Sequence, residues 1–172
     1  MSRVTAFIGL GANLGEPQRT LAWALQQLDA NPQVRVVAVS HLYRSAPVDA
    51  FGPDFLNAVA QLQTSLDAPA LMQLLLALER QAGRERPFRN APRLLDLDLL
   101  AFDALQLHTE ALRLPHPRLH LRRFVLEPLL EIAPALQLPG LPMLGERLRA
   151  VQDQAVQREP DNVNWWRPAA AG

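Results

Sequence analysis

Residues 92–102 read PRLLDLDLLAF, an apolar run that two aspartates interrupt. The alternation over residues 94–102 predicts a strand, because successive side chains of a strand point to opposite faces. Asp96 and Asp98 then lie on one face, about 6.6 Å apart at the backbone, and leucines occupy the other face. The strand therefore offers one face to a hydrophobic core and carries two neighbouring carboxylates on the other.

Upstream of this strand, hydrophobic periodicity predicts five further elements. An apolar strand over residues 4–10 leads through glycines to a helix that begins at Pro17, and alternating strands over 34–43 and 55–64 follow. A second helix, capped by Asp67 and ended by Gly83, precedes the strand at 94–102. The order βαββαβ is typical of a ferredoxin-like α+β fold, an antiparallel sheet with both helices on one face. Residues 124–132 and 144–151 predict additional C-terminal helices.

Length and composition indicate one globular domain, since 172 residues with 49% hydrophobic content are enough to bury a core. We assign residues 1–159 to this domain and expect residues 160–172 to form a loose tail. The chain has no cysteine and no run of eighteen apolar residues, so we expect a soluble, cytoplasmic protein, which we take to be a monomer. Seventeen basic and seventeen acidic residues cancel, which argues against nucleic acid or a membrane as a partner.

All seventeen basic residues are arginines. The absence of lysine excludes a P-loop lysine, a Schiff-base lysine and a lysine general base. Nine of the arginines fall between residues 80 and 123, so an anion-binding site is expected in that quarter of the chain.

The aspartate pair and the arginines before it predict a site for a polyphosphate. Two carboxylates that point the same way repel each other unless cations lie between them, and an oxygen-only site suits Mg²⁺. Arg84, Arg86, Arg89 and Arg93 precede the pair, and guanidinium groups bind phosphate through paired hydrogen bonds. In the alternative interpretation, the aspartates form ion pairs with Arg93 and another arginine on a solvated sheet face.

Two further motifs have competing interpretations. His116 and His120 stand four residues apart, but Pro117 disfavours a regular helix, so we favour a phosphate hydrogen bond for His116 over zinc binding or a purely structural role. The glycine motif GLGANLG at 9–15 is close to a dinucleotide fingerprint, but its third glycine falls one position too late. We interpret this motif as a tight strand-to-helix turn.

Asn57 lies on the strand face opposite Leu56 and Ala58, beside Phe55. Its amide carries both a donor and an acceptor, which suits the edge of a heterocycle, and a phenyl ring suits the face of one. A capped or solvated asparagine is the alternative interpretation.

Six stretches of the chain resemble one known family in their order and content. They are IGLGANLG at 8–15, SHLYRSAPV at 40–48, DFLNAV at 54–59, ER..GR.R at 79–86, PRLLDLDLL at 92–100 and PHPRLHLRRFVLEPLLEIAP at 115–134. Over residues 4–136 the chain resembles the 6-hydroxymethyl-7,8-dihydropterin pyrophosphokinase family of folate biosynthesis.

This resemblance implies an ATP- and Mg²⁺-dependent enzyme with a ferredoxin-like fold. The family transfers the pyrophosphoryl group of ATP to the hydroxymethyl oxygen of the pterin and leaves AMP. The resemblance implies two Mg²⁺ ions held by Asp96 and Asp98, and catalytic roles for these acids together with Arg84 and Arg93. It assigns to the triphosphate His116, Arg122, Arg84 and Arg93, and to the pterin Ser45, Val48, Phe55, Asn57 and Phe124.

A catalytically inactive nucleotide- or RNA-binding module of the same fold is the alternative. An RNA-binding version should show exposed aromatic residues on its central strands and a net positive charge. The chain has one tyrosine and no net charge, and the aspartate pair argues against a loss of activity.

Overall fold

The computed structural model describes residues 2–47, 52–83, 94–160 and 162–168. The described elements are, in chain order, β1 (Val4–Ala12), α1 (Pro17–Ala30), β2 (Val34–Val39), β3 (Tyr43–Ser45), β4 (Phe55–Thr64), α2 (Ala68–Ala82), β5 (Asp96–Phe102), β6 (Leu107–His108), β7 (Arg113–Leu114), the 3₁₀ turn η1 (Leu119–Leu121), α3 (Arg123–Ile132), α4 (Leu144–Ala150) and β8 (Val156–Arg158).

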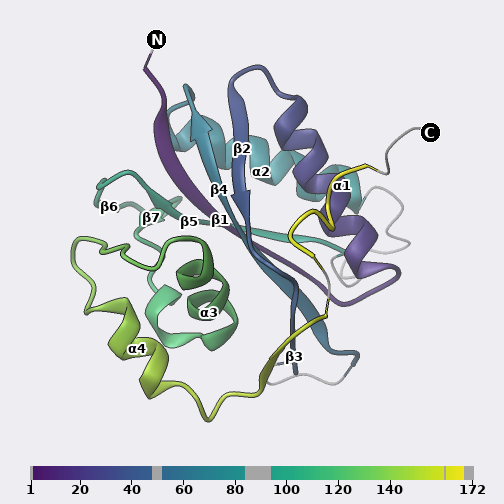
Figure 1. Cartoon of the computed structure of the whole chain (residues 1–172). Coiled ribbons are helices and arrows are strands. Elements are labelled where there is room, and N and C mark those ends of the chain that lie inside the picture. The colour runs from purple at the N-terminus through teal and green to yellow at the C-terminus, as the bar shows by residue number, and fades with distance from the viewer. Residues whose placement is uncertain (1, 48–51, 84–93, 161, 169–172) are drawn as a thin grey trace.

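Six of these strands form one antiparallel sheet within the described part of the chain. Its order is β5-β1-β4-β3-β8, and β2 pairs with the other half of β4 (Figure 1). β1 and β5, the first and last strands of the predicted βαββαβ unit, are neighbours, and β4 lies on the other side of β1. The predicted ferredoxin-like α+β fold is confirmed, and so are the C-terminal helices α3 and α4.

The predicted single strand over residues 34–43 is wrong, because the chain divides there into β2 and β3. The cause is Ser40, which lies between them and is fully buried. Its backbone N–H donates to the carbonyl of Val59, and its hydroxyl accepts the backbone N–H of Val59 at 3.0 Å. The side chain thus takes the place of a backbone carbonyl in the ladder, and the strand resumes only at Tyr43.

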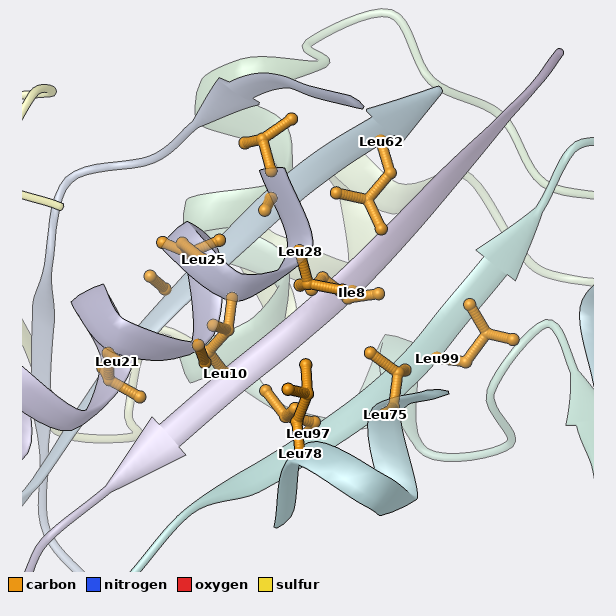
Figure 2. Packing of buried hydrophobic residues seen from close by; sticks show 14 of the residues in the cluster. Ile8, Leu10, Leu21, Leu25, Leu28, Leu62, Leu75, Leu78, Leu97 and Leu99 are labelled. Atoms are coloured by element: carbon orange, nitrogen blue, oxygen red, sulfur yellow. The ribbon is translucent and has the colours of Figure 1, made fainter. Parts of the chain in front are cut away.

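One face of the sheet forms the main core with α1 and α2. Proline at the start of each helix suits the first turn, and the carboxylate of Asp67 accepts the backbone N–H of Ala70 at 2.8 Å to cap α2. Ile8 of β1, Leu25 of α1 and Leu75 of α2 meet in this core, and all three are fully buried (Figure 2). Both helices therefore cover the same face, as the sequence predicted.

The opposite face carries a smaller core under α3 and α4. Phe7 and Val59 from the sheet pack there with Leu126 and Leu129 of α3. This core does not reach the glycine-containing end of β1, where Gly9 and Gly11 line an open cavity. The uncovered end of this face is where a ligand has room.

The tail begins differently from the prediction of a loose segment. Trp166 is only 4% exposed and belongs to the main core, and Gln26 of α1 donates to its carbonyl at 2.7 Å. The indole N–H of Trp165 donates to the carbonyl of Ser40 at 2.9 Å. The described part of the tail is therefore packed, because its two tryptophans supply the apolar surface that the Pro/Ala composition lacks. Among the described residues, no helix is long and apolar enough to cross a bilayer.

The packing of the tail can be tested by removing its buried tryptophan. We expect Trp166→Ala to lower the free energy of unfolding by about 3 kcal/mol or more, since it empties a core position. The matched control is Val163→Ala in the same tail, whose side chain is 44% exposed and whose loss should cost less than about 0.5 kcal/mol. Urea denaturation measures both. Equal stability of the two variants would show that the tail does not contribute to the core.

Candidate active site

A cavity of about 850 Å³ opens on the uncovered end of the sheet. Its floor comes from β1, β4 and β5, and its walls come from the N-terminal end of α3, the end of β3, and residues 154–156. Seven of the residues that the sequence assigned to a site line it: Ser45, Phe55, Asn57, Asp96, Asp98, Arg122 and Phe124. The fold thus brings together residues from four separate stretches of the chain.

Gly9 and Gly11 form the middle of the cavity floor. The register of β1 places Gly11 between Asn57 of β4 and Asp96 of β5, and Gly9 between Val59 and Asp98. A side chain at position 11 would begin 3.4 Å from the amide oxygen of Asn57, so it would fill the space beside that amide. The glycines leave the floor open between the amide and the carboxylates.

The interpretation of these glycines as a tight turn is therefore wrong for two of them. Gly9 and Gly11 belong to β1, which continues to Ala12. Only Gly15 has the positive φ, +65°, that a turn assigns to glycine, and it lies between β1 and α1. The rejection of a dinucleotide fingerprint agrees with this geometry.

Asp96 and Asp98 are half-buried on the cavity face of β5 while Leu97 and Leu99 face the main core, as the alternation predicted. A third acid, Glu79 of α2, also lines the cavity, and its carboxylate accepts the backbone N–H of Leu97 at 2.7 Å. Carboxylate oxygens are the ligands that Mg²⁺ prefers, so the donor set fits this ion. In the described residues no three acidic, histidine or cysteine side chains are placed to hold one metal ion together, so a cation here would take further ligands from substrate or water.

The amide of Asn57 is held in a fixed orientation at the other side of the glycines. Asn57 is 5% exposed, and its NH₂ group donates to the hydroxyl of Ser45 at 2.8 Å and to the carbonyl of Tyr43 at 3.3 Å. Its carbonyl oxygen lies toward Gly11 and the cavity. Phe55, two residues earlier on the same strand face, lines the cavity beside it. Asn57 is therefore neither a solvated nor a capping asparagine.

The N-terminal end of α3 brings a cation and an aromatic ring into the cavity wall. The guanidinium carbon of Arg122 lies 5.5 Å from the centre of the Phe124 ring, in a cation–π arrangement. Arg118 lines the same wall. Arg123 instead points away from this arginine pair, because its guanidinium donates to the backbone carbonyls of Gln152 and Gln154 at 3.0 and 2.8 Å. Neighbouring arginines of one motif thus have different tasks.

His116 lies next to the cavity and is not one of the residues that line it. Burial lowers the pKa of its imidazole, the cations Arg122 and Arg118 lower it further, and Asp98 opposes them by raising it. Its Nδ1 accepts the backbone N–H of Arg118 at 3.1 Å, which leaves Nε2 to carry the proton of the neutral ring. The zinc interpretation with His120 gains no support, since no ligand group of sufficient size is found in the described residues.

Three predicted site residues, Arg84, Arg93 and Val48, lie outside the described residues. The sequence interpretation gave no site role to Glu79 or to the segment 154–156, which also line the cavity, as does Arg118 of the predicted arginine cluster. Glu79 and Arg118 stand inside the motifs at 79–86 and 115–134, so their positions carried a signal. Residues 154–156 carried none, because the short stretch QAV has no distinctive pattern.

Comparison with known proteins gives one consistent relationship. Residues 7–134 match the family model described as 7,8-dihydro-6-hydroxymethylpterin-pyrophosphokinase (HPPK). The chain is 41% identical over 155 residues to the 2-amino-4-hydroxy-6-hydroxymethyldihydropteridine pyrophosphokinase of Pseudomonas aeruginosa, which covers 90% of this chain and 96% of the relative. It is 43% identical over 136 residues to the enzyme of the same name from Methylorubrum extorquens, covering 78% and 86%.

Solved structures show the same fold at low sequence identity. An HPPK-DHPS in complex with substrates superposes with a TM-score of 0.69 at 12% identity, over 89% of this chain and 44% of that one. The wild-type HPPK-DHPS of Plasmodium falciparum gives a TM-score of 0.67 at 12% identity, over 88% and 45%. The chain thus spans less than half the length of these structures. Its sequence matches, together with a cavity that joins an acid pair to a buried amide, establish that the chain belongs to the HPPK family and is a pyrophosphokinase of folate biosynthesis.

Proposed function

We propose that this cavity binds the pterin and the triphosphate of ATP side by side, with the glycines of β1 beneath the point where they meet. The observation that carries the proposal is the register of β1, which separates Asn57 from Asp96 by the single residue Gly11 across the sheet. A ligand that forms hydrogen bonds with the amide of Asn57 then lies next to a ligand bound at the carboxylates of Asp96 and Asp98. The pyrophosphoryl group passes from ATP to the hydroxymethyl oxygen of 6-hydroxymethyl-7,8-dihydropterin.

The phosphate half of the site consists of β5 and the residues before α3. Asp96 and Asp98 would hold two Mg²⁺ ions, which when bound neutralise phosphate charge and orient the triphosphate. Arg122 lines the same cavity as these acids and provides a permanent cation for the phosphate oxygens. His116 in its neutral form offers an N–H donor, and burial, together with the arginines around it, favours that form by lowering the pKa of the imidazole. Arg84 and Arg93 complete this half by resemblance.

The pterin half consists of β4, β3 and the ring of Phe124. The fixed NH₂ group of Asn57 leaves its carbonyl oxygen to accept an N–H from the edge of the heterocycle. Phe55 and Phe124 line the cavity as flat apolar surfaces for the faces of the ring system. Ser45 orients the amide of Asn57. Val48, three residues after Ser45 in the chain, belongs to this half by resemblance.

In the transfer step, the hydroxymethyl oxygen forms a bond to the β-phosphorus of ATP. The bond between that phosphorus and the oxygen that bridges it to the α-phosphorus breaks, its electron pair stays on the oxygen of AMP, and the hydroxyl proton passes to water. Positioning and charge neutralisation carry the catalysis, as in other phosphoryl transfers. We expect the enzyme to act as a monomer in the cytoplasm.

The products of the reaction test this proposal directly. We expect the purified protein, mixed with ATP, Mg²⁺ and 6-hydroxymethyl-7,8-dihydropterin, to form equal amounts of AMP and the pterin diphosphate, measured by ion-exchange chromatography. ADP as the main product would contradict transfer of the pyrophosphoryl group. Binding of both substrates without any product would identify the inactive nucleotide-binding alternative.

The role of the acid pair can be separated from a structural role by measuring stability together with turnover. We expect Asp98→Ala and Asp96→Ala to lower kcat on the order of 100-fold or more, because each removes charge that the transition state needs. Without added metal, the stability of Asp98→Ala should equal or exceed that of the unaltered protein, since one of two repelling carboxylates is gone.

The matched control for this pair is Asp103→Asn, an exposed acid just after β5, which should leave kcat unchanged. A loss of about 3 to 5 kcal/mol in the metal-free Asp98→Ala variant would instead place this acid in a structural ion-pair network.

The pterin half can be distinguished from the phosphate half by binding measurements. We expect Asn57→Ala and Phe124→Ala to raise the Kd for the pterin by about tenfold to a hundredfold, the effect of losing a buried hydrogen bond or a stacking surface. The Kd for Mg-ATP should change little. Gln61→Ala, further along β4, serves as the control. Calorimetry with each ligand decides the matter, and equal losses for both ligands would place the two residues in the core alone.

A further inference from the structure

The C-terminal residues 152–160 and 162–166, which we name the C-terminal strap, pass around the edge of the sheet. It begins beside α3, runs along β3 as β8, and ends against α1 on the opposite face (Figure 1). It lies outside residues 7–134, which the family model matches. Yet Gln154, Ala155 and Val156 form part of the cavity wall.

The strap is held at its first end by Arg123. The guanidinium donates to two strap carbonyls, those of Gln152 and Gln154, and is itself held by the carboxylate of Glu127 at 3.2 Å. The backbone N–H of Arg123 donates to the side-chain oxygen of Gln154 at 2.9 Å, and the side-chain NH₂ of Gln154 donates to the carbonyl of Leu121 at 2.9 Å. One residue of α3 thus fixes the part of the strap that enters the cavity wall.

The middle of the strap is paired to the strand that orients the site amide. β8 pairs with β3 in a register that places Val156 opposite Ser45. Ser45 in turn accepts the NH₂ group of Asn57 at 2.8 Å. Because β3 has only three residues and lies between β4 and β8, its position depends on both neighbours.

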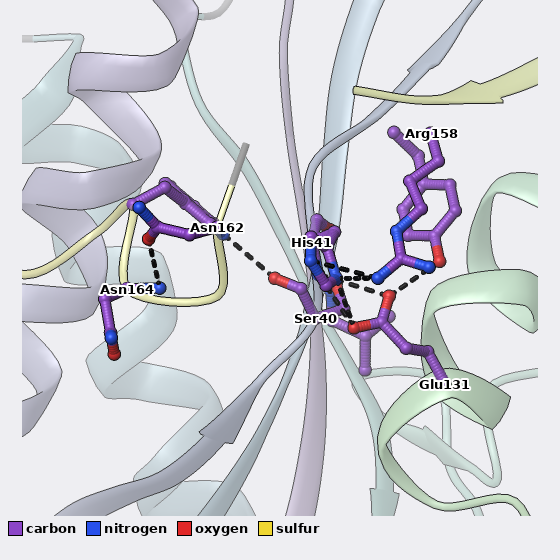
Figure 3. Close-up of polar contacts among 9 residues, drawn as sticks. Ser40, His41, Glu131, Arg158, Asn162 and Asn164 are labelled. Carbon is purple, nitrogen blue, oxygen red and sulfur yellow. Dashed lines mark hydrogen bonds and ion pairs between the residues drawn. The ribbon is translucent and has the colours of Figure 1, made fainter. Parts of the chain in front are cut away.

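Outside the cavity lining, a cluster of polar side chains stabilises the pairing of β8 with β3. Nδ1 of His41 lies 2.8 Å from the carboxylate of Glu131 of α3, and the guanidinium of Arg158 of β8 contacts both nitrogens of the same imidazole, at 2.9 Å from Nε2 (Figure 3). The hydroxyl of Tyr43 donates to the same Glu131 at 2.6 Å. Burial, followed by the bond to Glu131, strongly raises the pKa of this hydroxyl, which therefore stays a donor. Arg44 forms an ion pair with Glu159 directly after β8.

We propose that the C-terminal strap sets the position of β3 and one wall of the cavity, and thereby determines the affinity for the pterin. Arg123 and Arg158 are its positioning residues, at the two ends of the part that borders the site. The inference rests on the proposed placement of the pterin beside Asn57. The strap borders the pterin half through Ser45 and its own Val156, whereas beside Arg122 it contacts only the backbone of Leu121 and Arg123 through Gln154. We therefore expect the phosphate half to respond less than the pterin half.

Two variants test this role, and each removes a different contact of the C-terminal strap. Arg123→Ala removes the hold on residues 152 and 154, and Arg158→Ala removes the contact with His41 without altering α3. Arg147→Ala is the matched control, because Arg147 also donates to a backbone carbonyl, that of His120 at 3.1 Å, but does not touch the strap. Titrations measure the Kd of 6-hydroxymethyl-7,8-dihydropterin with Mg²⁺ and a non-hydrolysable ATP analogue present, and the Kd of that analogue alone. Hydrogen exchange of the β3 amides reports the position of β3.

We expect both strap variants to raise the pterin Kd about tenfold, equal to about 1.4 kcal/mol, and to speed exchange in β3. The Kd of the ATP analogue should stay within about twofold in these variants, and both constants should do so in the control. Unchanged pterin binding, equal loss of both ligands, or an effect of Arg123→Ala alone would overturn the role of the strap. Failure of the unaltered protein to bind the pterin would overturn the proposed function itself.

Discussion

The pairing of β1 with β4 on one side and β5 on the other is the interaction on which the rest of the structure depends. It joins strands that lie more than thirty positions apart in the sequence, and it does so in one register. That register places the amide of Asn57 and the carboxylates of Asp96 and Asp98 on the same face, with glycines between them. A shift by one residue would turn these side chains into the leucine-rich core, so the core itself holds the register.

Helices cover the two faces of the sheet to different extents, and this difference explains the location of the cavity. The face under α1 and α2 is filled by leucines from both helices and from β1, β4 and β5, and it holds the larger of the two cores. The opposite face is covered by α3 and α4 only over Phe7, Val59 and their neighbours. Polar site residues can therefore be exposed at one end of the sheet without weakening the main core.

The arginines show how one residue type serves several purposes within a single motif. Arg122 stacks beside Phe124 at the cavity, while its neighbour Arg123 turns away and binds backbone carbonyls of the C-terminal strap. A guanidinium group has five donors in a fixed plane, which suits both tasks. Spacing along the chain does not distinguish them, because the direction of each side chain is set by the first turn of α3.

The sequence by itself determined the order of strands and helices, the face of β5 that carries Asp96 and Asp98, and the face of β4 that carries Asn57. These follow from periods of two and of about 3.6 residues, which are properties of neighbouring positions. Three features emerge only in the folded chain: Ser40 divides a predicted strand, Gly9 and Gly11 belong to β1, and the described part of the tail packs through Trp166. Each of these depends on a partner distant in the chain, Val59, Asn57 and Gln26 respectively, and local periodicity holds no information about such partners.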